Sequence, residues 1–373
     1  MTKRPGRTPV RVLLTTSSIS VEPIVACTRN SFGESTVSLG TKAPNEQSNV
    51  FPTSEVGSTL KPVILILPNV EAKPGSGRRT ARHGGKFNAI GLMPPGDYAI
   101  SDMIRSPYLR ELTLGVAQAC DEAGATLSLI NGTDSSRAST IRKALVDGFI
   151  LGHSADIELV SSAKRRRLPF VILESDAGAD VNSIRIDGKG GALLAVEHLA
   201  ALGHRRFVIL SIRRTAGPPI VHMPFTAGRM ITAGFQFDRQ RLDGFAEGLA
   251  KVGLSIDNVP IIETTPGDPS AGAVVFDRAP EATAILTMSD WQAITVLNEA
   301  VRRGICIPER VSVVGFDGTS ESARTVPPLT TIAQDIVGKG KLAAAMVLAN
   351  DRPRQIVMPV KLLVRGSTAP PRS

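Results

Sequence analysis

From about residue 88 onward, short apolar runs alternate with amphipathic segments along the chain. The run Asn88–Met93 predicts a strand, and the helical spacing of Leu109, Leu112 and Val116 predicts a helix that ends at Gly124. The same patterns predict strands at 126–130, 148–151, 170–173, 207–210, 284–287 and 311–314, and helices at 157–164, 192–202, 242–252 and 292–303. Such alternation is typical of parallel sheets covered by helices. Roughly 280 residues are many for one open sheet, so we expect two lobes.

The first 60 residues lack this order. Eighteen of them are Ser or Thr, and the apolar residues follow neither a helical nor a strand period. Only Arg11–Ile19 and Val50–Leu60 have the composition of short strands. Residues 61–70 form an apolar segment with two prolines, and residues 71–87 form a basic linker broken by four glycines. We therefore predict an irregular N-terminal region ahead of an ordered α/β module.

The net charge of the chain is concentrated in that N-terminal region. Lys and Arg number 43 and Asp and Glu 34, which gives a net charge of +9. Residues 1–88 contain 12 basic and 5 acidic side chains (+7), whereas the other 285 residues contain 31 and 29 (+2). A basic head commonly meets phosphates or anionic membranes, although a solvated tail has the same composition. An anionic partner, if there is one, therefore belongs to the head rather than to the nearly neutral module.

Neither a membrane protein nor an exported protein is indicated. No run of 18 apolar residues exists. The segment Val12–Ala26 faintly resembles a lipoprotein signal, but Glu22, Pro23 and several hydroxyl residues interrupt its apolar core. Three widely spaced cysteines form neither a disulfide framework nor a zinc pattern: Cys27, Cys120 and Cys306. This usage suits a reducing compartment, so we expect a cytoplasmic protein with no membrane partner.

Polar side chains follow several of the predicted strands. Ligands of open parallel sheets bind beyond the carboxyl ends of the strands. The residues near those ends are Ser106, Tyr108, Glu174, Arg241, Ser289, Asp290, Trp291, Phe316 and Asp317. Carboxylates accept hydroxyl protons, a guanidinium donates in a fork and rings cover the apolar faces of sugars. The set therefore suits a polyhydroxylated ligand or another small polar metabolite. Helix capping is the better explanation for a single residue such as Asp290, and it is the recurrence at several strand ends that favours a cleft.

Catalytic and cofactor signatures are missing. The sequence has no Walker-type phosphate loop, no G-x-G-x-x-G after its first strand and no H-E-x-x-H. The stretch Gly152–Asp156 lacks the second glycine of a nucleophile elbow. His198 and His204 flank a helix end, where a structural role is expected. We therefore expect a binding protein without enzymatic activity, cofactor or metal.

Several segments resemble one known family in the same order along the chain. They are VNSIRIDGKGGALLAVEHLAALGHRRFVIL at 181–210, RLDGF at 241–245, TAILTMSDWQAITVLNEAVRRGICIPERVSVVGFD at 283–317, PPLTTIAQD at 327–335 and LVRGSTAPP at 363–371. Together they resemble the ligand-sensing part of lactose-repressor-type (LacI/GalR family) transcription regulators. The resemblance covers about residues 87–371. It implies a periplasmic-binding-protein-like α/β fold, in which two Rossmann-like lobes with parallel sheets are joined by a three-stranded hinge and enclose a cleft.

The resemblance also implies domain boundaries. Residues 1–78 stand where the family has its DNA-binding head, 79–88 where it has a hinge or linker, and 89–371 where it has the ligand-sensing domain. Within that domain, the first lobe would comprise about 89–204 and 335–350, and the second about 205–333 and 355–366.

Expected ligand contacts follow from the matching motifs. The resemblance implies that Arg241 grips the ligand, that Asp317 is the cleft carboxylate and that Gln334 lies beside the hinge. Glu174 stands where the family often has Asp, and Tyr108 replaces a common aromatic residue. Ser289 and Asp290 stand where the family has an Asn–Asp pair. The connection 212–237 is longer than in many members, and we expect it to roof the cleft.

The N-terminal head departs from the family pattern. Family members begin with a helix-turn-helix domain of roughly 60 residues whose second helix enters the major groove. Residues 1–10 resemble a family leader, but the expected turn and helical spacing do not follow, and the resemblance resumes only near 79–88. We hypothesise that residues 11 to about 78 are a frame-shifted or decayed head. DNA contact would then be left to linker side chains, with weak and salt-dependent binding: Arg78, Arg79, Arg82 and Lys86.

The sequence as a whole predicts a LacI-type regulator. Its cleft would bind a small sugar-like effector, its homodimer would bind operator DNA, and cleft closure would change operator affinity. Two alternatives stay open: a sugar-binding lipoprotein of a transporter tethered at Cys27, and a sensor domain that has lost DNA binding. A sugar hydrolase or dehydrogenase would need a motif that the sequence does not show.

Overall fold

The computed structural model describes residues 24–29, 35–40, 87–95, 98–132, 137–152, 157–175, 178–213, 217–224, 236–350 and 352–372. Contacts divide the chain into two units, Met1–Ser76 and Gly77–Ser373. In the first unit, β1 (Ile24–Arg29) and β2 (Ser35–Gly40) pair antiparallel, a pairing that the sequence did not predict. Several predicted features lie outside the described residues: the strands at 11–19 and 50–60, and Arg78, Arg79, Arg82 and Lys86.

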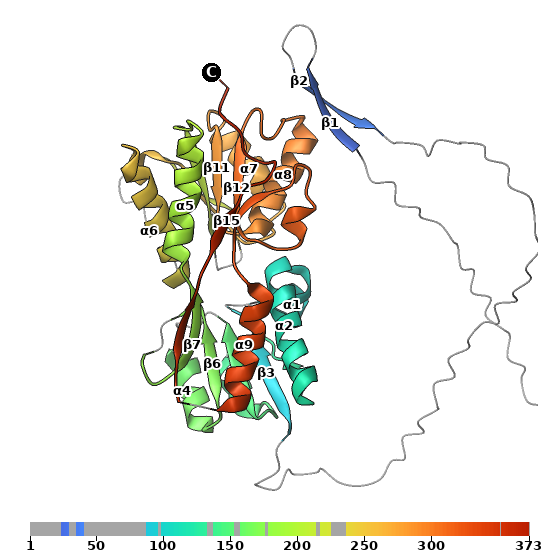
Figure 1. The fold of residues 1–373 in the computed structure, drawn as a ribbon, viewed down its shortest axis with the longest axis vertical. Coiled ribbons are helices and arrows are strands. Elements are labelled where there is room, and N and C mark those ends of the chain that lie inside the picture. The colour runs from blue at the N-terminus through green and yellow to red at the C-terminus, as the bar shows by residue number, and fades with distance from the viewer. Residues whose placement is uncertain are drawn as a thin grey trace, which may run out of the picture. The chain divides into compact units, whose positions relative to one another are not determined.

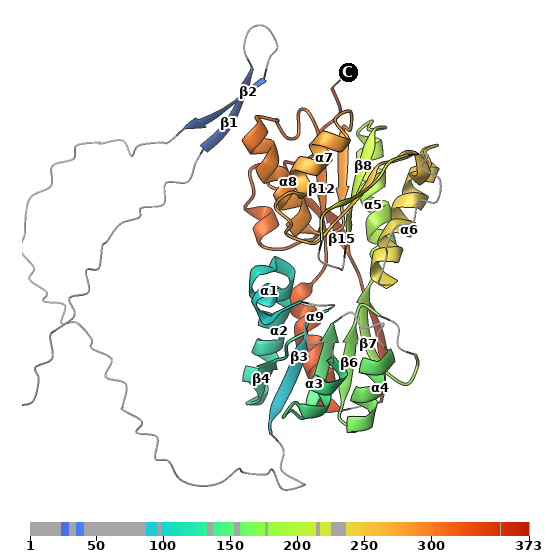
Figure 2. The ribbon, with the colours of Figure 1, turned by 180° about the vertical axis from the view of Figure 1, so that it is seen from behind.

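The first lobe of the second unit is built on a six-stranded parallel sheet (Figure 1). The strands, in their order across the sheet, are β14 (Gln355–Met358), β7 (Asn182–Ile186), β6 (Phe170–Leu173), β5 (Gly148–Gly152), β3 (Ala89–Met93) and β4 (Thr126–Leu129). One face is covered by α2 (Pro107–Ala123), which α1 (Ile100–Arg105) precedes, and by α9 (Ile336–Ala349). The other face is covered by α3 (Arg137–Lys143) and α4 (Ile157–Arg166), which Figure 2 shows in front. Apolar strand residues therefore point into a core on both faces, as expected of a parallel sheet.

The second lobe has a seven-stranded sheet with the same layering. Across the sheet the strands are β15 (Lys361–Leu363), β13 (Thr330–Ala333), β12 (Ser312–Asp317), β11 (Ala284–Thr287), β8 (Phe207–Ile212), β10 (Ile261–Thr264) and β9 (Ile220–His222). The two edge strands, β9 and β15, are antiparallel to their neighbours, and the inner pairs are parallel. One face is covered by α5 (Gly188–Ala201) and α6 (Gln236–Lys251), and the other by α7 (Ala271–Arg278) and α8 (Asp290–Arg303). Two short 3₁₀ turns complete the lobe, η1 (Ile256–Asn258) and η2 (Glu321–Ala323).

The chain passes between the two sheets three times: between β7 and β8, between β13 and β14, and between β14 and β15. These crossings correct two of the expected boundaries. Helix α5 was expected in the first lobe, but its buried Ala192, Val196 and Leu199 pack in the core of the second, mainly against α6. Strand β14 was expected in the second lobe, but it pairs with β7 in the first. Neither change is visible in the sequence, because apolar helix faces and β-rich segments fit both lobes equally well.

Helices α2 and α9 approach each other closely at a pair of glycines. A Cβ added at Gly115 would overlap the carbonyl oxygen of Val337, and one added at Gly340 would overlap the carbonyl oxygen of Leu112. The absent side chains let the two backbones touch. This close approach of the two helices holds α9, which begins just after β13, against the first lobe.

The periodic elements of the sequence are confirmed at 89–93, 107–123, 126–129, 148–152, 157–166, 170–173, 207–212, 284–287, 290–303 and 312–317. Helix α6 begins at Gln236, so Arg241 lies inside the helix rather than at its start. The described part of the long connection after β8 forms β9 at the sheet edge, and its remaining residues, 214–216 and 225–235, lie outside the described part. Among the described residues, no helix is long and apolar enough to span a membrane.

Candidate ligand-binding cleft

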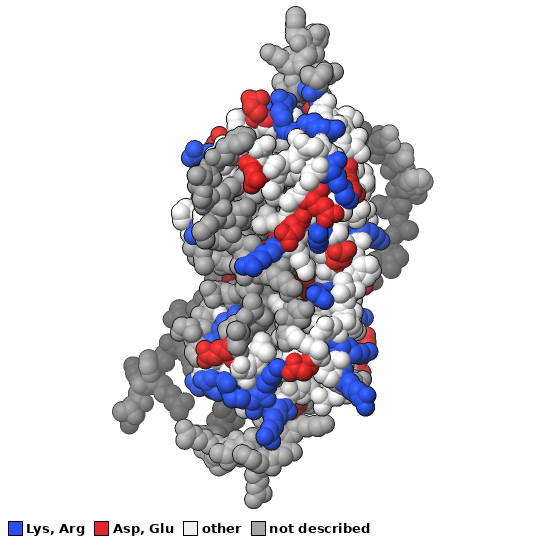
Figure 3. Space-filling view, turned by 90° about the vertical axis from the view of Figure 1, so that its left-hand side faces the viewer, with Lys and Arg blue, Asp and Glu red and all other residues white. Residues whose placement is uncertain are grey.

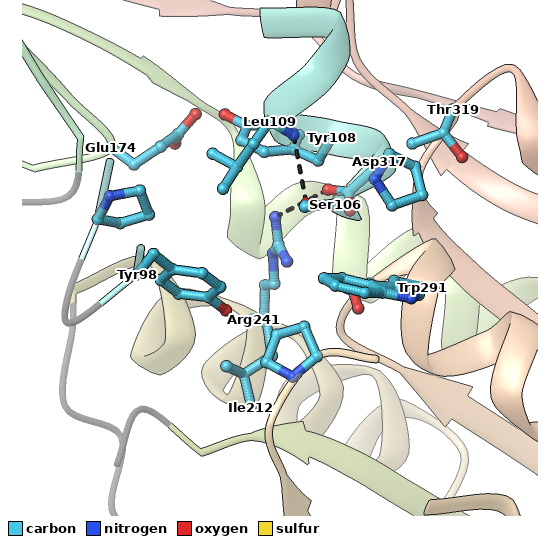
Figure 4. Close-up of a pocket in the computed structure, with 14 residues that line it drawn as sticks. Tyr98, Ser106, Tyr108, Leu109, Glu174, Ile212, Arg241, Trp291, Asp317 and Thr319 are labelled. Atoms are coloured by element: carbon cyan, nitrogen blue, oxygen red, sulfur yellow. Dashed lines mark hydrogen bonds and ion pairs between the residues drawn. The ribbon is translucent and has the colours of Figure 1, made fainter. Parts of the chain in front are cut away.

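A cavity with an empty volume of about 570 Å³ opens between the carboxyl ends of the two sheets (Figure 4). The first lobe contributes Pro95, Tyr98, Ser106, Pro107, Tyr108, Leu109 and Glu174, and the second contributes Ile212, Arg241, Pro266, Ser289, Trp291, Asp317 and Thr319. The lining therefore combines apolar and aromatic side chains with a few polar groups, as ligand sites do.

Arg241 occupies the centre of the cleft in Figure 4 and is firmly held by the second lobe. Its guanidinium carbon lies 3.8 Å from the centre of the Phe316 ring, and Nη1 donates a hydrogen bond to the carbonyl oxygen of Met288. Nη2 lies 3.6 Å from Oδ1 of Asp317. Stacking and hydrogen bonding fix the plane of the guanidinium, which then presents its remaining donors in a defined direction.

Asp317, at the end of β12, is the buried carboxyl of the second lobe. Its backbone φ is +129°, an unusual value for a residue other than glycine, and its Oδ1 accepts a hydrogen bond of 2.9 Å from Nε2 of Gln334. Burial raises the pKa of Asp317 to about 8, and the charge of Asp290 adds to the rise. Arg241, Lys339 and the Gln334 hydrogen bond act in the opposite direction. A carboxyl with such a pKa can donate as well as accept a hydrogen bond near neutral pH.

Asp290 does not reach the cleft, although the resemblance implied that it would. It is fully buried, and its Oδ2 accepts hydrogen bonds from the backbone N–H and the hydroxyl of Thr319, at 2.7 and 2.9 Å. Its Oδ1 accepts a hydrogen bond from the hydroxyl of Thr331. Burial raises the pKa of Asp290, while these hydrogen bonds favour its charged form. Asp290 thus holds the Thr319 loop in place, and the helix is capped by its neighbour Ser289, whose Oγ accepts from the N–H of Gln292 at 3.2 Å.

The first lobe supplies Glu174 and Tyr108. Glu174 follows β6 in a left-handed conformation (φ +55°), which turns its side chain toward the cleft, where it lines the cavity. Its Oε2 accepts a hydrogen bond of 3.3 Å from the N–H of Ile186. Ser106 caps α2 by accepting from the N–H of Leu109 at 3.3 Å, and this start of the helix brings Tyr108 to the cavity wall.

Lys339, which sequence reasoning missed, lies directly behind this wall. Its side chain is fully buried, and its ammonium donates hydrogen bonds to Glu174 Oε1, Gln334 Oε1 and the Tyr108 hydroxyl. A signal was present in the sequence, because position 339 falls on the apolar stripe of α9 with Ile336 and Ala343. A charged residue on such a stripe indicates a buried partner.

Two further rings complete the cleft. Figure 4 shows Tyr98 and Trp291 on opposite sides of Arg241. Trp291 is the only tryptophan in the chain, and it packs against Gly267, where a Cβ would overlap the indole ring. Sequence reasoning noted Trp291 but not Tyr98, because a single tyrosine in a loop carries no periodic signal.

The two lobes also touch at the rim of the cleft. Arg110 on α2 forms an ion pair with Glu321 in η2. The neighbouring Glu111 accepts a hydrogen bond of 2.7 Å from the backbone N–H of Ser320. These contacts join the first turns of α2 to the loop after β12.

Of the seven residues expected to contact a ligand, the structure brings five to the cavity wall: Tyr108, Glu174, Arg241, Ser289 and Asp317. Asp290 and Gln334 lie behind the wall, each in a hydrogen bond with a lining residue. Within the described part of the chain, no three His, Cys, Asp or Glu side chains are grouped as metal ligands would be.

Comparison with known proteins shows what this architecture is similar to. The model of the periplasmic binding protein-like domain matches residues 196–368. An HTH-type transcriptional regulator of Mycobacterium tuberculosis is 30% identical over 302 residues, which cover 77% of this chain and 81% of the relative.

Solved structures of LacI family regulators have a similar fold. A LacI family regulator from Corynebacterium glutamicum superposes with a TM-score of 0.66 and 27% identity, covering 75% of this chain and 86% of the other. A LacI family regulator from Enterococcus faecium with bound ribose has the same fold, with a TM-score of 0.63 and 22% identity, covering 76% of this chain and 99% of the other.

Proposed function

The chain belongs to the LacI/GalR family of transcription regulators, and from this premise we propose that its cleft binds a small sugar or sugar derivative that controls DNA binding. The observation that carries the ligand class is the arrangement around Arg241. A fixed guanidinium beside the Asp317 carboxyl lies between two aromatic rings, Tyr98 and Trp291. Hydroxyl groups match the donor and acceptor pair, and the apolar faces of a sugar ring match the aromatic side chains. The relative from E. faecium that holds ribose has the same fold.

Ligand binding would act on DNA through the crossings between the lobes. A ligand bound to both walls favours one relative orientation of the lobes over others, and it shifts the equilibrium by its difference in affinity. In a homodimer, this shift would change the spacing of two DNA-binding heads. We propose a cytoplasmic homodimer with no enzymatic activity, in keeping with relatives that are transcription regulators.

A group of basic side chains supports a DNA partner for the ordered module itself. The basic cluster is defined by the exposed Arg142 and Lys143 at the end of α3 and Lys164, Arg165 and Arg167 at the end of α4. Figure 3 shows Lys and Arg side chains gathered over the lower part of one face. Arg166 ties the two helix ends together by donating to the carbonyl oxygens of Ile141, Arg142 and Ala144.

The first described residues of the first lobe, beginning at Phe87, are held by Asp147. Asp147, just after α3, accepts hydrogen bonds from the N–H groups of Phe87 and Ala89 at 3.0 and 3.2 Å. Asp147 thus ties Phe87 to the segment that follows the end of α3. DNA phosphates that contact the side chains of the basic cluster would add a contribution to binding that depends strongly on salt.

Trp291 fluorescence provides a direct test of ligand binding, because the chain has no other tryptophan. The full chain is titrated with ribose and with a panel of other mono- and disaccharides. We expect a saturable change in emission with at least one of them, lost in R241M and retained in the control R302M, whose arginine lies at the far end of α8. A protein whose emission responds to none of these sugars would overturn the ligand class.

DNA binding is tested separately by gel shift with a duplex from the region upstream of the gene. We expect a shift that weakens as salt increases, and a further loss when Arg142, Lys143 and Arg165 are replaced by Glu. Specific binding that ligand abolishes or enhances would support a regulator. Retained ligand binding without any shift would leave a sensor that has lost its DNA-binding head.

A further inference from the structure

Lys339 is the largest of the fully buried charged side chains in the described residues, and the only one of them that is cationic. An isolated ammonium in such a place would be costly, so its partners must compensate for the lost water. An ammonium has three N–H donors, and three acceptors surround Lys339: Glu174 Oε1, Gln334 Oε1 and, at 3.4 Å, the Tyr108 hydroxyl. The charge is therefore both paired and fully hydrogen-bonded.

These three acceptors belong to different parts of the fold. Glu174 follows β6 and Tyr108 begins α2, both in the first lobe, whereas Gln334 follows β13 at a crossing between the lobes. Since the Lys339 ammonium binds the carbonyl end of the Gln334 amide, the amide's NH₂ end is turned the other way. That end donates a hydrogen bond of 2.9 Å to Oδ1 of Asp317 in the second lobe. Asp317 in turn lies beside Arg241.

The bonds to Glu174 change the character of the first-lobe wall. Oε1 of Glu174 accepts a hydrogen bond from the Lys339 ammonium, and Oε2 accepts one of 3.3 Å from the N–H of Ile186. Both oxygens thus have protein donors, and the negative charge is balanced within the lobe. A ligand would therefore meet a first-lobe carboxylate that Lys339 already pairs.

We propose that Lys339 is a positioning residue that couples the two walls of the cleft: it fixes Glu174 and Tyr108 in the first lobe and, by orienting the Gln334 amide, holds Asp317 in the second. The relay is defined as Glu174, Lys339, Gln334 and Asp317. This inference rests on the proposed function only in taking the cleft as the ligand site. The relay makes the orientation of the lobes depend on Asp317, so that a ligand engaging Asp317 acts on the crossing beside it.

The test uses a variant pair that removes charge without leaving an unpaired ion. In E174Q/K339M both buried charges disappear together. If Lys339 and Glu174 formed only a structural ion pair, the cleft of this variant should open no more than that of the wild type. The relay predicts otherwise, because the methionine side chain introduced by K339M has no N–H donor with which to orient Gln334. The matched control is E247Q/K189M, which removes an exposed ion pair of the second lobe with a Lys–Glu distance of 2.9 Å.

Acrylamide quenching of Trp291 in the ligand-free full chain measures how open the cleft is. We expect the quenching constant of E174Q/K339M to rise about twofold, since uncoupled lobes spend more time apart, and that of the control pair to stay at the wild-type value. Q334M interrupts the relay without touching a charge and should give the same rise. Quenching constants for E174Q/K339M and Q334M equal to the wild type would overturn the proposal.

The single variants separate coupling from folding. K339M and E174Q each leave one buried charge, so both should melt at lower temperature than the double variant, whichever role Lys339 has. If E174Q/K339M does not fold, Q334M decides the question alone. Because no sugar is present in the quenching assay, failure to find a ligand would count against the proposed function and not against the relay.

Discussion

Replacing Asp317 by Asn tests the buried carboxyl of the cleft in its simplest form. The amide has the shape of the carboxyl and keeps an oxygen for the hydrogen bond from Gln334. It cannot titrate, so the two proteins should differ mainly in the proton of residue 317. Burial raises the pKa of Asp317 to about 8, whereas an unfolded Asp has a pKa of about 3.9.

The sign of the effect follows from which state binds the proton. Below about pH 4 the side chain is protonated in both states and contributes no pH dependence. As the pH rises from about 4 to about 8, the unfolded chain releases the proton while the folded chain keeps it, so stability is lost at about 1.4 kcal/mol per pH unit. Between pH 5 and pH 8 the wild type should therefore lose about 3–4 kcal/mol relative to D317N.

Urea unfolding followed by Trp291 fluorescence measures this difference, because Trp291 and Asp317 belong to the same lobe. Groups shared by both proteins, such as His198 and His204, whose pKa values are lowered by burial, cancel in the comparison. A difference in unfolding free energy that stays constant to within about 1 kcal/mol from pH 5 to pH 8 would refute the reasoning. It would mean that Asp317 is ionised in the folded protein, as a full ion-pair partner of Arg241.

Three further substitutions test the packing that supports the cleft. K339M alone should lower the urea-unfolding free energy by about 3–5 kcal/mol, because a buried carboxylate loses its partner; a loss below about 1 kcal/mol would contradict the buried ion pair. G340A should lower the melting temperature measured by circular dichroism, since its Cβ overlaps the α2 backbone, although the same change in an exposed helix stabilises by about 1 kcal/mol. G267A should shift the Trp291 emission maximum, because the indole ring must move; an unchanged spectrum would show that the ring packs elsewhere.

Local patterns in the sequence were enough to locate the main strands and helices, and strand ends were enough to find Asp317 and Glu174, whereas Arg241 was found from the RLDGF motif. Periodicity could not say which sheet a helix or edge strand joins, so α5 and β14 were assigned to the wrong lobes. Those choices depend on contacts between residues that are distant in sequence.

The same limit applies to the site. Asp290 and Asp317 both follow a strand and look equivalent in the sequence, yet one is enclosed by threonine hydroxyls and the other lines the cavity. Lys339 follows no strand at all, and its role depends on Glu174, which lies 165 residues away. The only sequence signal for this role was the position of a charged residue on an apolar helix stripe.

The chain's repeated passage between the lobes has a consequence for synthesis on the ribosome. Five strands of the first sheet are complete once residue 186 has emerged, but α9, which covers one of its faces, and the edge strand β14 follow only after six of the seven strands of the second sheet. The nascent first lobe must therefore wait with this face covered only by α1 and α2, and contacts of such long sequence separation form slowly. A chain truncated anywhere before residue 336 would leave the part of that face beneath α9 permanently exposed, so the first lobe depends on the last tenth of the sequence for its solubility.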